Sequence, residues 1–283
     1  MKNTSGLSNA DKKIVNEFYR SSNEYFSTID SHNESNFGQY IEILKPMRGI
    51  SLDVGCGTGF VSICIAKKGH PCYGIDISPI AVKMAEDRAL SSNTAGKTEF
   101  RVSSPTVIPY PNDFFEKVGA FAVIEHFTDP ESVFGEMIRV LKPDGLLIIQ
   151  SPNFLSPFVH QNEKGYLDSK VSVAKIFCPQ SYKNFSMILS KFLKINNTLQ
   201  FSAKNLQYIK TGVKVDGDKD AVFMANPQDI AGSLSKSTMK IELCSSFSLR
   251  WQNNTAIKAV NLMPILKYFG PTTLIIARKR ISV

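Results

Sequence analysis

The 283-residue sequence lacks the features that mark membrane-spanning and secreted proteins. No stretch approaches the roughly 18–20 consecutive apolar residues that a membrane-spanning helix needs. Residues 1–13, MKNTSGLSNADKK, are polar and contain no apolar run of the kind found in a secretory signal. We therefore expect a protein with no membrane span that stays in the cytoplasm.

Cysteine is also scarce, and its spacing argues against two kinds of site. The chain has five cysteines, an odd number, and none of them forms a CxxC pair. Neither a disulfide framework nor a zinc site is indicated by this arrangement. Residues 216–220, DGDKD, lack the full spacing and the closing glutamate of a calcium loop. No metal is expected, and buried free thiols are the preferred interpretation of the cysteines.

A concentrated basic surface is missing too, although the formal net charge is +8. The densest basic run is only ARKR at 277–280. No basic stripe alternates with aromatic residues in the manner of proteins that grip single-stranded nucleic acid. A solvated surface or an anionic small substrate therefore explains the charge better than a nucleic-acid partner.

Apolar strand patterns alternate with helical patterns along most of the chain. Ser78-Pro79 and Asp129-Pro130 each place a capping side chain before a proline, which is typical of a helix start. The alternation predicts an α/β fold with a parallel sheet and helices on both faces. Strands are expected at 49–55, 72–77, 98–104, 117–127, 145–151, 239–248 and 272–280. Helices are expected near 14–19, 37–44, 60–69, 79–90, 130–141, 227–234 and 257–269.

Three alternating glycines follow the first expected strand of this sheet. Residues 50–60, ISLDVGCGTGF, contain Gly55, Gly57 and Gly59. Ligands of open parallel sheets bind beyond the carboxyl ends of the strands, where glycine lets a ligand touch the backbone. A dinucleotide fingerprint reads G-x-G-x-x-G, but Phe60 stands in the place of its third glycine. A nicotinamide cofactor is therefore disfavoured.

The stretch LDVGCGTG, residues 52–59, resembles motif I of the class I S-adenosylmethionine-dependent methyltransferases. Asp76, at the end of the second strand, has the position of that family's ribose-binding acid. The resemblance is to small-molecule enzymes with a core of the methyltransferase domain 11 type, and it covers residues 48–151 and the closing strand. It implies a Rossmann-like, doubly wound, seven-stranded, mostly parallel sheet with N-terminal helices and an inserted cap. Further matching segments are PYPNDFFEKV, IEHF, EMIRVLKPDG and LLII.

Four regions are expected on this basis. They are an N-terminal helical lid at 1–45, an S-adenosylmethionine-binding core at 46–153, an inserted cap or substrate segment at 154–225 and a C-terminal completion of the sheet at 226–283. In the N-terminal helices, Tyr19, Tyr25 and Phe26 either close over the cofactor or pack on the sheet, and packing is preferred. In the inserted segment several polar residues are interpreted singly as surface residues rather than ligands: His160, Tyr166, Tyr182, Asp216, Asp218 and Asp220.

The resemblance also assigns cofactor contacts. Asp53 is expected near the methionine amino group, Asp76 at the two ribose hydroxyls and Ile77 against the adenine. Where many relatives have an acid that binds the adenine amino group, this chain has Ser103 and Ser104, and the Ser104 hydroxyl is the expected substitute. The remaining expected contacts to the methionine part, or residues that orient the cofactor, are Gly55, Cys56, Gly57, Gly59 and Glu125.

His126, in IEHF, is the candidate catalytic residue. Methyl transfer from a sulfonium is an in-line displacement that needs no metal, and holding the two reactants in line supplies much of the acceleration. A hydroxyl acceptor also needs a base, and histidine titrates near neutral pH. Relatives share this histidine across very different acceptors, so a role in shaping the site stays open beside the role of base.

The expected function is methyl transfer from S-adenosylmethionine, with S-adenosylhomocysteine as product. The acceptor is expected to be a small molecule or a glycan, methylated at a hydroxyl oxygen. Residues 221–230 and 262–279 resemble methyltransferases of surface-polysaccharide or natural-product biosynthesis. Two alternatives stay open. One is an RNA methyltransferase, although the N-P-P-[FYW] signature is missing, and the other is a cofactor-binding protein without catalysis. Nothing in the sequence indicates an oligomeric state.

Overall fold

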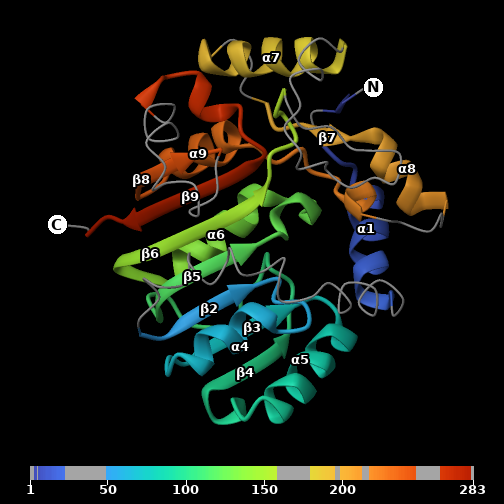
Figure 1. The fold of residues 1–283 in the computed structure, drawn as a ribbon. Helices are drawn as coiled ribbons and strands as arrows, with labels where there is room; N and C mark the ends of the chain where they lie inside the picture. Colours follow the sequence, from blue (N-terminus) through green and yellow to red (C-terminus); the bar gives the residue numbers. More distant parts are fainter. Residues whose placement is uncertain are drawn as a thin grey trace.

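The computed structural model describes residues 3–4, 6–22, 49–157, 179–194, 198–211, 217–246 and 262–281. A seven-stranded sheet runs through this part of the chain in the order β4-β3-β2-β5-β6-β9-β8 (Figure 1). The first five strands in that order are parallel, whereas β9 is antiparallel to both of its neighbours. The strands are β2 (Ser51–Val54), β3 (Cys72–Asp76), β4 (Thr98–Val102), β5 (Phe115–Phe121), β6 (Leu141–Pro152), β8 (Met239–Ser245) and β9 (Thr272–Lys279). The expected α/β class and doubly wound sheet are confirmed.

The order of the strands reverses between β2 and β5. From β2 the chain builds outward through β3 and β4 on one side, and it then returns to build β5 and β6 on the other. Loops at such a switch point diverge to opposite faces, which opens a crevice at the carboxyl ends of the strands. The glycine loop that follows β2 lies at this point.

Helix starts follow the same local chemistry in three places. The side chains of Ser78, Asp129 and Asn226 accept the N–H groups of Ala81, Ser132 and Asp229, and each capping residue precedes a proline. This arrangement satisfies an N–H group that has no partner in the first turn, and the proline already has helical φ. The helices are α1 (Asn9–Ser21), α4 (Phe60–Lys67), α5 (Pro79–Ser91), α6 (Pro130–Val140), α7 (Pro179–Phe192), α8 (Ala203–Thr211) and α9 (Pro227–Ser235).

Apolar side chains hold helices on both faces of the sheet. On one face Met137 of α6 and Ile230 of α9 pack in the same cluster as Phe115 of β5. On the other face Ile65 of α4 packs with Ile148 of β6, and a neighbouring cluster joins α4 and α5 to β4. Full burial of one such side chain contributes about 1.5–3 kcal/mol, so the two layers fix the strand order.

The fourth expected strand, 117–127, is shorter than predicted. β5 ends at Phe121, and Ala122 takes a left-handed conformation with φ of 50°. Its N–H group donates to the carbonyl of Gln150 at 2.8 Å, and Ile124–His126 then form a 3-10 turn. Ile124 is fully buried, so the apolar character of this stretch reflects packing rather than strand geometry.

One helical expectation changes. Within the described residues, the expected helix 257–269 is helical only at Leu262, and a 3-10 turn follows at Leu266–Tyr268. Pro264 explains the change, because it lacks an N–H group and disfavours helical geometry at the residue before it. The expected helix at 37–44 and residues 257–261 lie outside the described residues.

The N-terminal segment is joined to the segment between β6 and α9. The short strand β1 (Asn3–Thr4) pairs antiparallel with β7 (Phe201–Ser202). Figure 1 shows α1 and α8 side by side, and Val15 of α1 packs with Ile209 of α8 in a cluster that Ile77, after β3, also contacts. The carboxylate of Asp11 and the Nζ of Lys210 are 2.5 Å apart.

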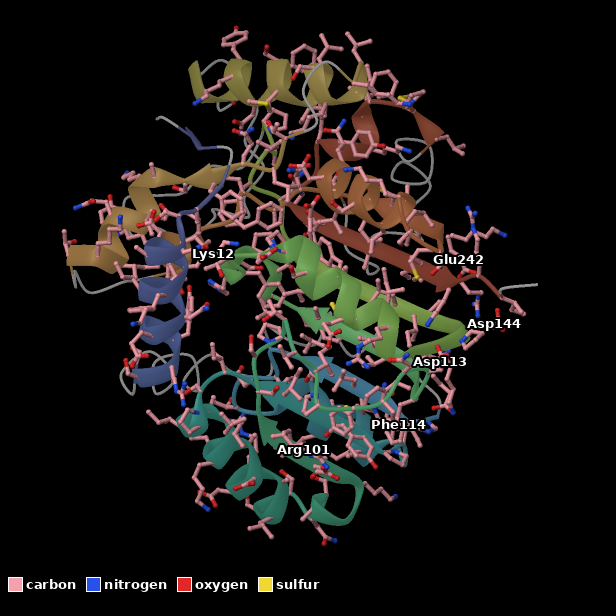
Figure 2. All side chains as sticks on the ribbon, turned by 180° about the vertical axis from the view of Figure 1, so that it is seen from behind. Lys12, Arg101, Asp113, Phe114, Asp144 and Glu242 are labelled. Carbon is pink, nitrogen blue, oxygen red and sulfur yellow. The ribbon has the colours of Figure 1, made fainter. Side chains whose placement is uncertain are left out.

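Residues 277–279 of the ARKR run form the end of β9, and the charges of Arg278 and Lys279 are paired. Arg278 lies 2.6 Å from the carboxylate of Glu242 and 3.6 Å from that of Asp144, and Lys279 lies 2.7 Å from that of Asp113. Figure 2 shows these three acids together at the end of the sheet opposite α1. Arg278 and Lys279 of the densest basic run are therefore paired locally, and the run lies away from the glycine loop.

A buried ion pair connects α7 to α9. Lys191 Nζ and Asp229 Oδ1 are 2.6 Å apart, and their side chains are only 2% and 4% exposed. Lys191 also donates to the carbonyl of Thr198, and Asn226 donates to the second carboxylate oxygen of Asp229. Burial raises the pKa of Asp229, and Lys191 opposes that rise.

We expect Asp229→Leu to lower the free energy of unfolding by about 3–5 kcal/mol, because it leaves the Lys191 ammonium buried without its carboxylate. The double variant Lys191→Met/Asp229→Leu should recover most of the loss, since an apolar pair can replace a buried ion pair at little cost. Urea unfolding measures both variants. A double variant no more stable than the single one would contradict this account.

Candidate functional site

The glycine loop at the switch point takes a left-handed conformation at three positions. Gly55, Gly57 and Gly59 have φ of 70°, 51° and 79°. Residues other than glycine rarely adopt this left-handed backbone conformation. A Cβ atom at Gly55 would lie 2.3 Å from Cγ2 of Val123, and one at Gly59 would lie 2.8 Å from Cβ of Ala85. Close packing thus explains why two of the three positions are glycine.

Gly57 is different, because a Cβ atom there would meet nothing within 4 Å. Its N–H group donates to Asp76 Oδ2 at 2.9 Å, so this open backbone surface borders a buried carboxylate. An open position between two tightly packed glycines is the geometry that a bound ligand requires for close approach to the backbone.

Asp76 ends β3 and is 8% exposed. In addition to Gly57, the N–H group of Ser78 donates to its Oδ1 at 2.9 Å. Burial raises the pKa of Asp76, whereas these backbone hydrogen bonds and the charge of His126 lower it. An ionised carboxylate has about four acceptor positions, so the two N–H groups leave capacity for the hydroxyl groups of a ligand.

Asp53, in β2, is more deeply buried. It is 2% exposed, and its Oδ2 accepts the hydroxyl of Ser62 from α4 at 2.7 Å. Burial raises the pKa of Asp53 to about 7, and the negative charge of Asp76 adds to the rise. A cationic group bound beside Asp53 would favour its ionised form.

The other expected cofactor contacts lie around these two acids. Cys56 is buried, and burial holds the pKa of its thiol well above the ordinary value, which excludes a reactive thiolate. Ile77 is partly buried and packs against the cluster of Val15 and Tyr19. Ser104 lies in the loop after β4, where its hydroxyl is 2.8 Å from that of Thr106.

The 3-10 turn after β5 carries Glu125 and His126. Glu125 is 2% exposed, and its carbonyl accepts the N–H group of Phe223 at 2.9 Å. The His126 side chain is 14% exposed, and its Nε2 lies 3.9 Å from Glu125 Oε1. The other ring nitrogen, Nδ1, lies 2.8 Å from the hydroxyl of Tyr19 and 3.5 Å from Asp220 Oδ2.

Tyr19 and Asp220 both lie beside His126, a position that the sequence interpretation predicted for neither residue. Tyr19 does pack in the α1 cluster as expected, but its hydroxyl also reaches His126. Asp220 was expected at the surface, yet it is 1% exposed and accepts from Tyr19. Two signals pointed toward burial: Tyr19 shares a helical face with Val15, and Asp220 directly precedes the apolar residues 221–223.

The other singled-out residues divide between surface positions and positions outside the described residues. Tyr182 on α7 is 60% exposed, as expected for a surface residue. Tyr25, Phe26, His160, Tyr166 and Asp216 lie outside the described residues, as does the side chain of Asp218. Within the described ranges no group of His, Cys, Asp and Glu side chains could hold a metal ion. No helix in these ranges has the length and apolarity that a bilayer crossing requires.

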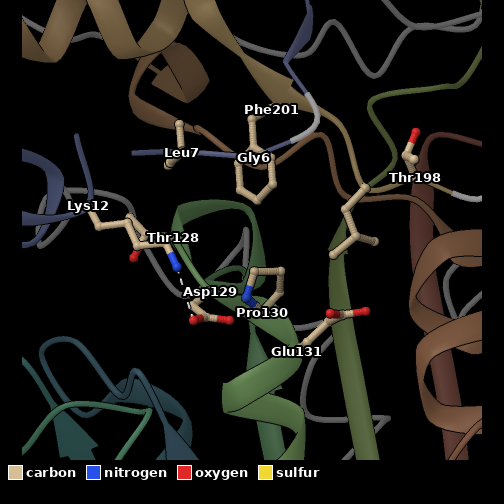
Figure 3. Close-up of a pocket in the computed structure, with 10 residues that line it drawn as sticks. Gly6, Leu7, Lys12, Thr128, Asp129, Pro130, Glu131, Thr198 and Phe201 are labelled. Carbon is tan, nitrogen blue, oxygen red and sulfur yellow. Dashed lines mark hydrogen bonds and ion pairs between the residues drawn. The ribbon is translucent and has the colours of Figure 1, made fainter. Parts of the chain in front are cut away.

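A pocket of about 280 Å³ lies beside the start of α6 rather than at the glycine loop. Figure 3 shows its lining, in which Lys12 of α1 faces Asp129, the capping residue of α6. Their charged atoms are 3.1 Å apart. Because no residue of 53–59 lines this pocket, we place the functional site at the glycine loop instead.

Comparison with known proteins places the glycine loop inside a recognised domain. Residues 52–149 match the family described as "Methyltransferase domain". Ajmaline N-methyltransferase of Rauvolfia serpentina is 37% identical over 137 residues, which cover 46% of this chain and 47% of the relative. Ubiquinone biosynthesis O-methyltransferase of Paracidovorax citrulli is 30% identical over 129 residues, which cover 45% of this chain and 51% of the relative. The chain thus spans about half the length of these curated relatives.

A solved S-adenosylmethionine-dependent methyltransferase from Mesorhizobium loti has the same fold. It superposes with a TM-score of 0.54 and covers 86% of this chain and 97% of its own, at 15% sequence identity. At this identity the similarity establishes the fold alone.

The raised pKa of Asp53 has a measurable consequence for stability. Because the folded protein keeps this proton between about pH 4 and pH 7 and the unfolded chain does not, the free energy of unfolding should fall as pH rises through that window. Asp53→Asn removes the effect, so its stability relative to the wild type should rise by up to about 1.4 kcal/mol per pH unit between pH 5 and 7.

Urea unfolding at pH 5, 6, 7 and 8 tests this expectation. Asp87→Asn is the matched control, since that carboxylate is on α5 with 58% of its side chain exposed, and its difference from the wild type should stay constant. A constant difference for Asp53→Asn as well would mean that Asp53 is ionised throughout.

Proposed function

We propose that the chain transfers a methyl group from S-adenosylmethionine to the hydroxyl oxygen of a small-molecule acceptor, because residues 52–149 match a methyltransferase domain. The observation that carries the proposal is the open backbone of Gly57 beside the buried carboxylate of Asp76, at the switch point of the sheet. S-Adenosylhomocysteine is the expected product.

The residues around the glycine loop fit this cofactor. Asp76 can accept hydrogen bonds from the ribose hydroxyls. The buried Asp53 suits the ammonium of the methionine part, since a carboxylate and an ammonium close together stabilise one another's charge. Gly57 would contact the methionine part through its backbone, flanked by Gly55, Cys56 and Gly59. Ile77 and Ser104 are proposed to contact the adenine, and Glu125 is proposed to orient the cofactor.

When bound, S-adenosylmethionine supplies a methyl carbon to which the acceptor oxygen bonds as the carbon–sulfur bond breaks, leaving S-adenosylhomocysteine and one proton. His126 is the proposed acceptor of that proton, because its imidazole is partly exposed at the carboxyl end of β5. Nearby Glu125 and Asp220 favour the charged imidazolium that forms. A positioned base contributes about 10²–10⁴-fold to such a reaction.

The acceptor is proposed to be a small molecule or a glycan. The names of the two curated relatives, ajmaline N-methyltransferase and ubiquinone biosynthesis O-methyltransferase, support a small acceptor. The ARKR run, in which Arg278 and Lys279 are paired with acids, offers no support for RNA. Residues 154–225 and the N-terminal helix are proposed to cover the acceptor, and the contact of α1 with α8 supports this.

Gly57→Ala should weaken S-adenosylmethionine binding by at least about tenfold, because the added methyl group enters the space beside Asp76. The left-handed backbone also costs about 1–2 kcal/mol of stability. Gly69→Ala is the matched control, since Gly69 has φ of 92°, has open space around its Cβ position and follows α4 at the other end of the sheet. It should lose similar stability and keep the wild-type affinity in calorimetric titration.

Methyl-labelled S-adenosylmethionine tests the activity itself. The chain is incubated with cell extract that has been separated into RNA, protein, lipid, glycan and small-molecule fractions, and the label is followed. Label in the small-molecule or glycan fraction, on a carbon bonded to oxygen, is the expected result. Label in RNA, or on nitrogen, would overturn the proposed acceptor, and absence of label with bound cofactor would overturn catalysis on the acceptors present.

His126→Ala is expected to reduce the transfer of label by about 10²-fold or more while cofactor affinity is retained. Unchanged transfer would assign His126 to shaping the site rather than to removing the proton.

A further inference from the structure

Three polar side chains from distant parts of the chain meet at His126. Tyr19 comes from α1, His126 from the turn after β5 and Asp220 from the end of the 3-10 turn Gly217–Asp220. The Tyr19 hydroxyl lies 2.8 Å from His126 Nδ1, 3.0 Å from the carbonyl of Asp220 and 3.1 Å from its Oδ2. Tyr19 and Asp220 are 8% and 1% exposed, so these contacts lie in the interior.

A count of hydrogens gives the direction of these bonds. The phenol has one hydrogen, and both oxygens of Asp220 near it can only accept when the carboxylate is ionised. A phenol that donated to Nδ1 would turn its own lone pairs toward those two oxygens. The favoured arrangement therefore runs from His126 Nδ1–H to the Tyr19 oxygen, and from the Tyr19 hydrogen to Asp220.

The surrounding packing holds the three groups in place. The rings of Tyr19 and His126 meet edge to face with centroids 5.1 Å apart. Asn205 of α8 donates to the carbonyl of Ala221 at 2.7 Å, next to Asp220. The N–H group of Phe223 donates to the carbonyl of Glu125, next to His126. Asp220 and His126 are thus fixed to one another through backbone contacts of their neighbours.

We propose that Tyr19 and Asp220 are positioning residues that fix the tautomer of His126, with hydrogen on Nδ1 and the basic lone pair on Nε2. The role of Nε2 as the proton acceptor rests on the proposed methyl transfer. The N-terminal helix and the segment between β6 and α9 then do more than cover the acceptor. Together they set the protonation state of the proposed base.

Three acids in the part of the chain that the structure describes face His126. Asp220 approaches Nδ1, Glu125 approaches Nε2 at 3.9 Å, and Asp76 interacts with the imidazole charge from the end of β3. An imidazolium is stabilised by such neighbours. Of the three, only Asp220 acts on the nitrogen opposite the proposed proton acceptor, so its removal should alter the titration without touching the acceptor side.

Nitrogen-15 NMR of the imidazoles tests the tautomer directly. The chain has four histidines, so selective labelling gives few signals, and His126→Gln identifies the one of interest. In the wild type, neutral His126 should carry its hydrogen on Nδ1. In Tyr19→Phe the Nε2–H tautomer should become populated, because Nδ1 has lost the phenol oxygen. In Asp220→Asn the titration midpoint of His126 should fall by about one pH unit or more.

Matched variants separate these effects from general ones. Tyr208→Phe removes a phenol from α8, which packs beside α1, and Asp144→Asn removes an acid whose side chain is 65% exposed at the far end of the sheet. Both should leave the His126 signals unchanged. If Asp220→Asn fails to fold, Tyr19→Phe decides the question, since it conserves the volume and the apolar contacts of the ring. An unchanged tautomer in Tyr19→Phe overturns the proposal.

Kinetics give a second readout once a labelled acceptor is known. Tyr19→Phe and Asp220→Asn should lower kcat by about tenfold or more while the affinity for S-adenosylmethionine stays within about twofold of the wild type. In Asp220→Asn the acidic side of the pH–rate profile should move to lower pH, together with the titration midpoint of His126 measured by NMR. An NMR result as expected without any methyl transfer would overturn the proposed function and leave the tautomer assignment standing. Transfer that is unaffected by either variant would overturn the positioning role.

Discussion

The carboxylate of Asp76 accepts N–H groups from both Gly57 and Ser78, and so it joins the end of β3 to the loop that follows β2. This contact lies where the parallel sheet reverses its strand order, the place at which such sheets form a ligand crevice. It also holds the glycine loop in the conformation that keeps Gly57 open. The geometry of the proposed cofactor site depends on this buried carboxylate more than on any other side chain.

Burial of several acids at one end of the sheet produces a site that favours cations. Asp53 and Asp76 both have raised pKa values, chiefly because burial penalises their charged forms, and the charge of Asp76 adds to the rise at Asp53. Glu125 and Asp220 are also almost fully buried. Such a group of acids costs stability in the ligand-free protein. A ligand with a sulfonium and an ammonium group would relieve that cost on binding, so the same charges that weaken the free fold favour the proposed cofactor.

Local patterns of the sequence were sufficient to predict most strands and helices of the core. The cap-and-proline pairs at Ser78, Asp129 and Asn226 predict helix starts because each depends on neighbouring residues only. The run 117–127 was misjudged because an apolar stretch does not distinguish a strand from a buried turn, and the left-handed Ala122 has no sequence signature. The meeting of Tyr19 and Asp220 could not be predicted, because these residues are 201 positions apart and neither belongs to a motif.

The sequence similarity to a known family is confined to one part of the chain. The family match covers residues 52–149, which include every residue proposed to hold the cofactor and His126 itself. Tyr19 and Asp220 lie on either side of that range, in segments that contact one another through α1 and α8. In the proposed reaction the core therefore binds the methyl donor, and the flanking segments are proposed to contact the acceptor. If they also set the tautomer of His126, a change in the acceptor cover alters the reactivity of the base as well as the shape of the pocket.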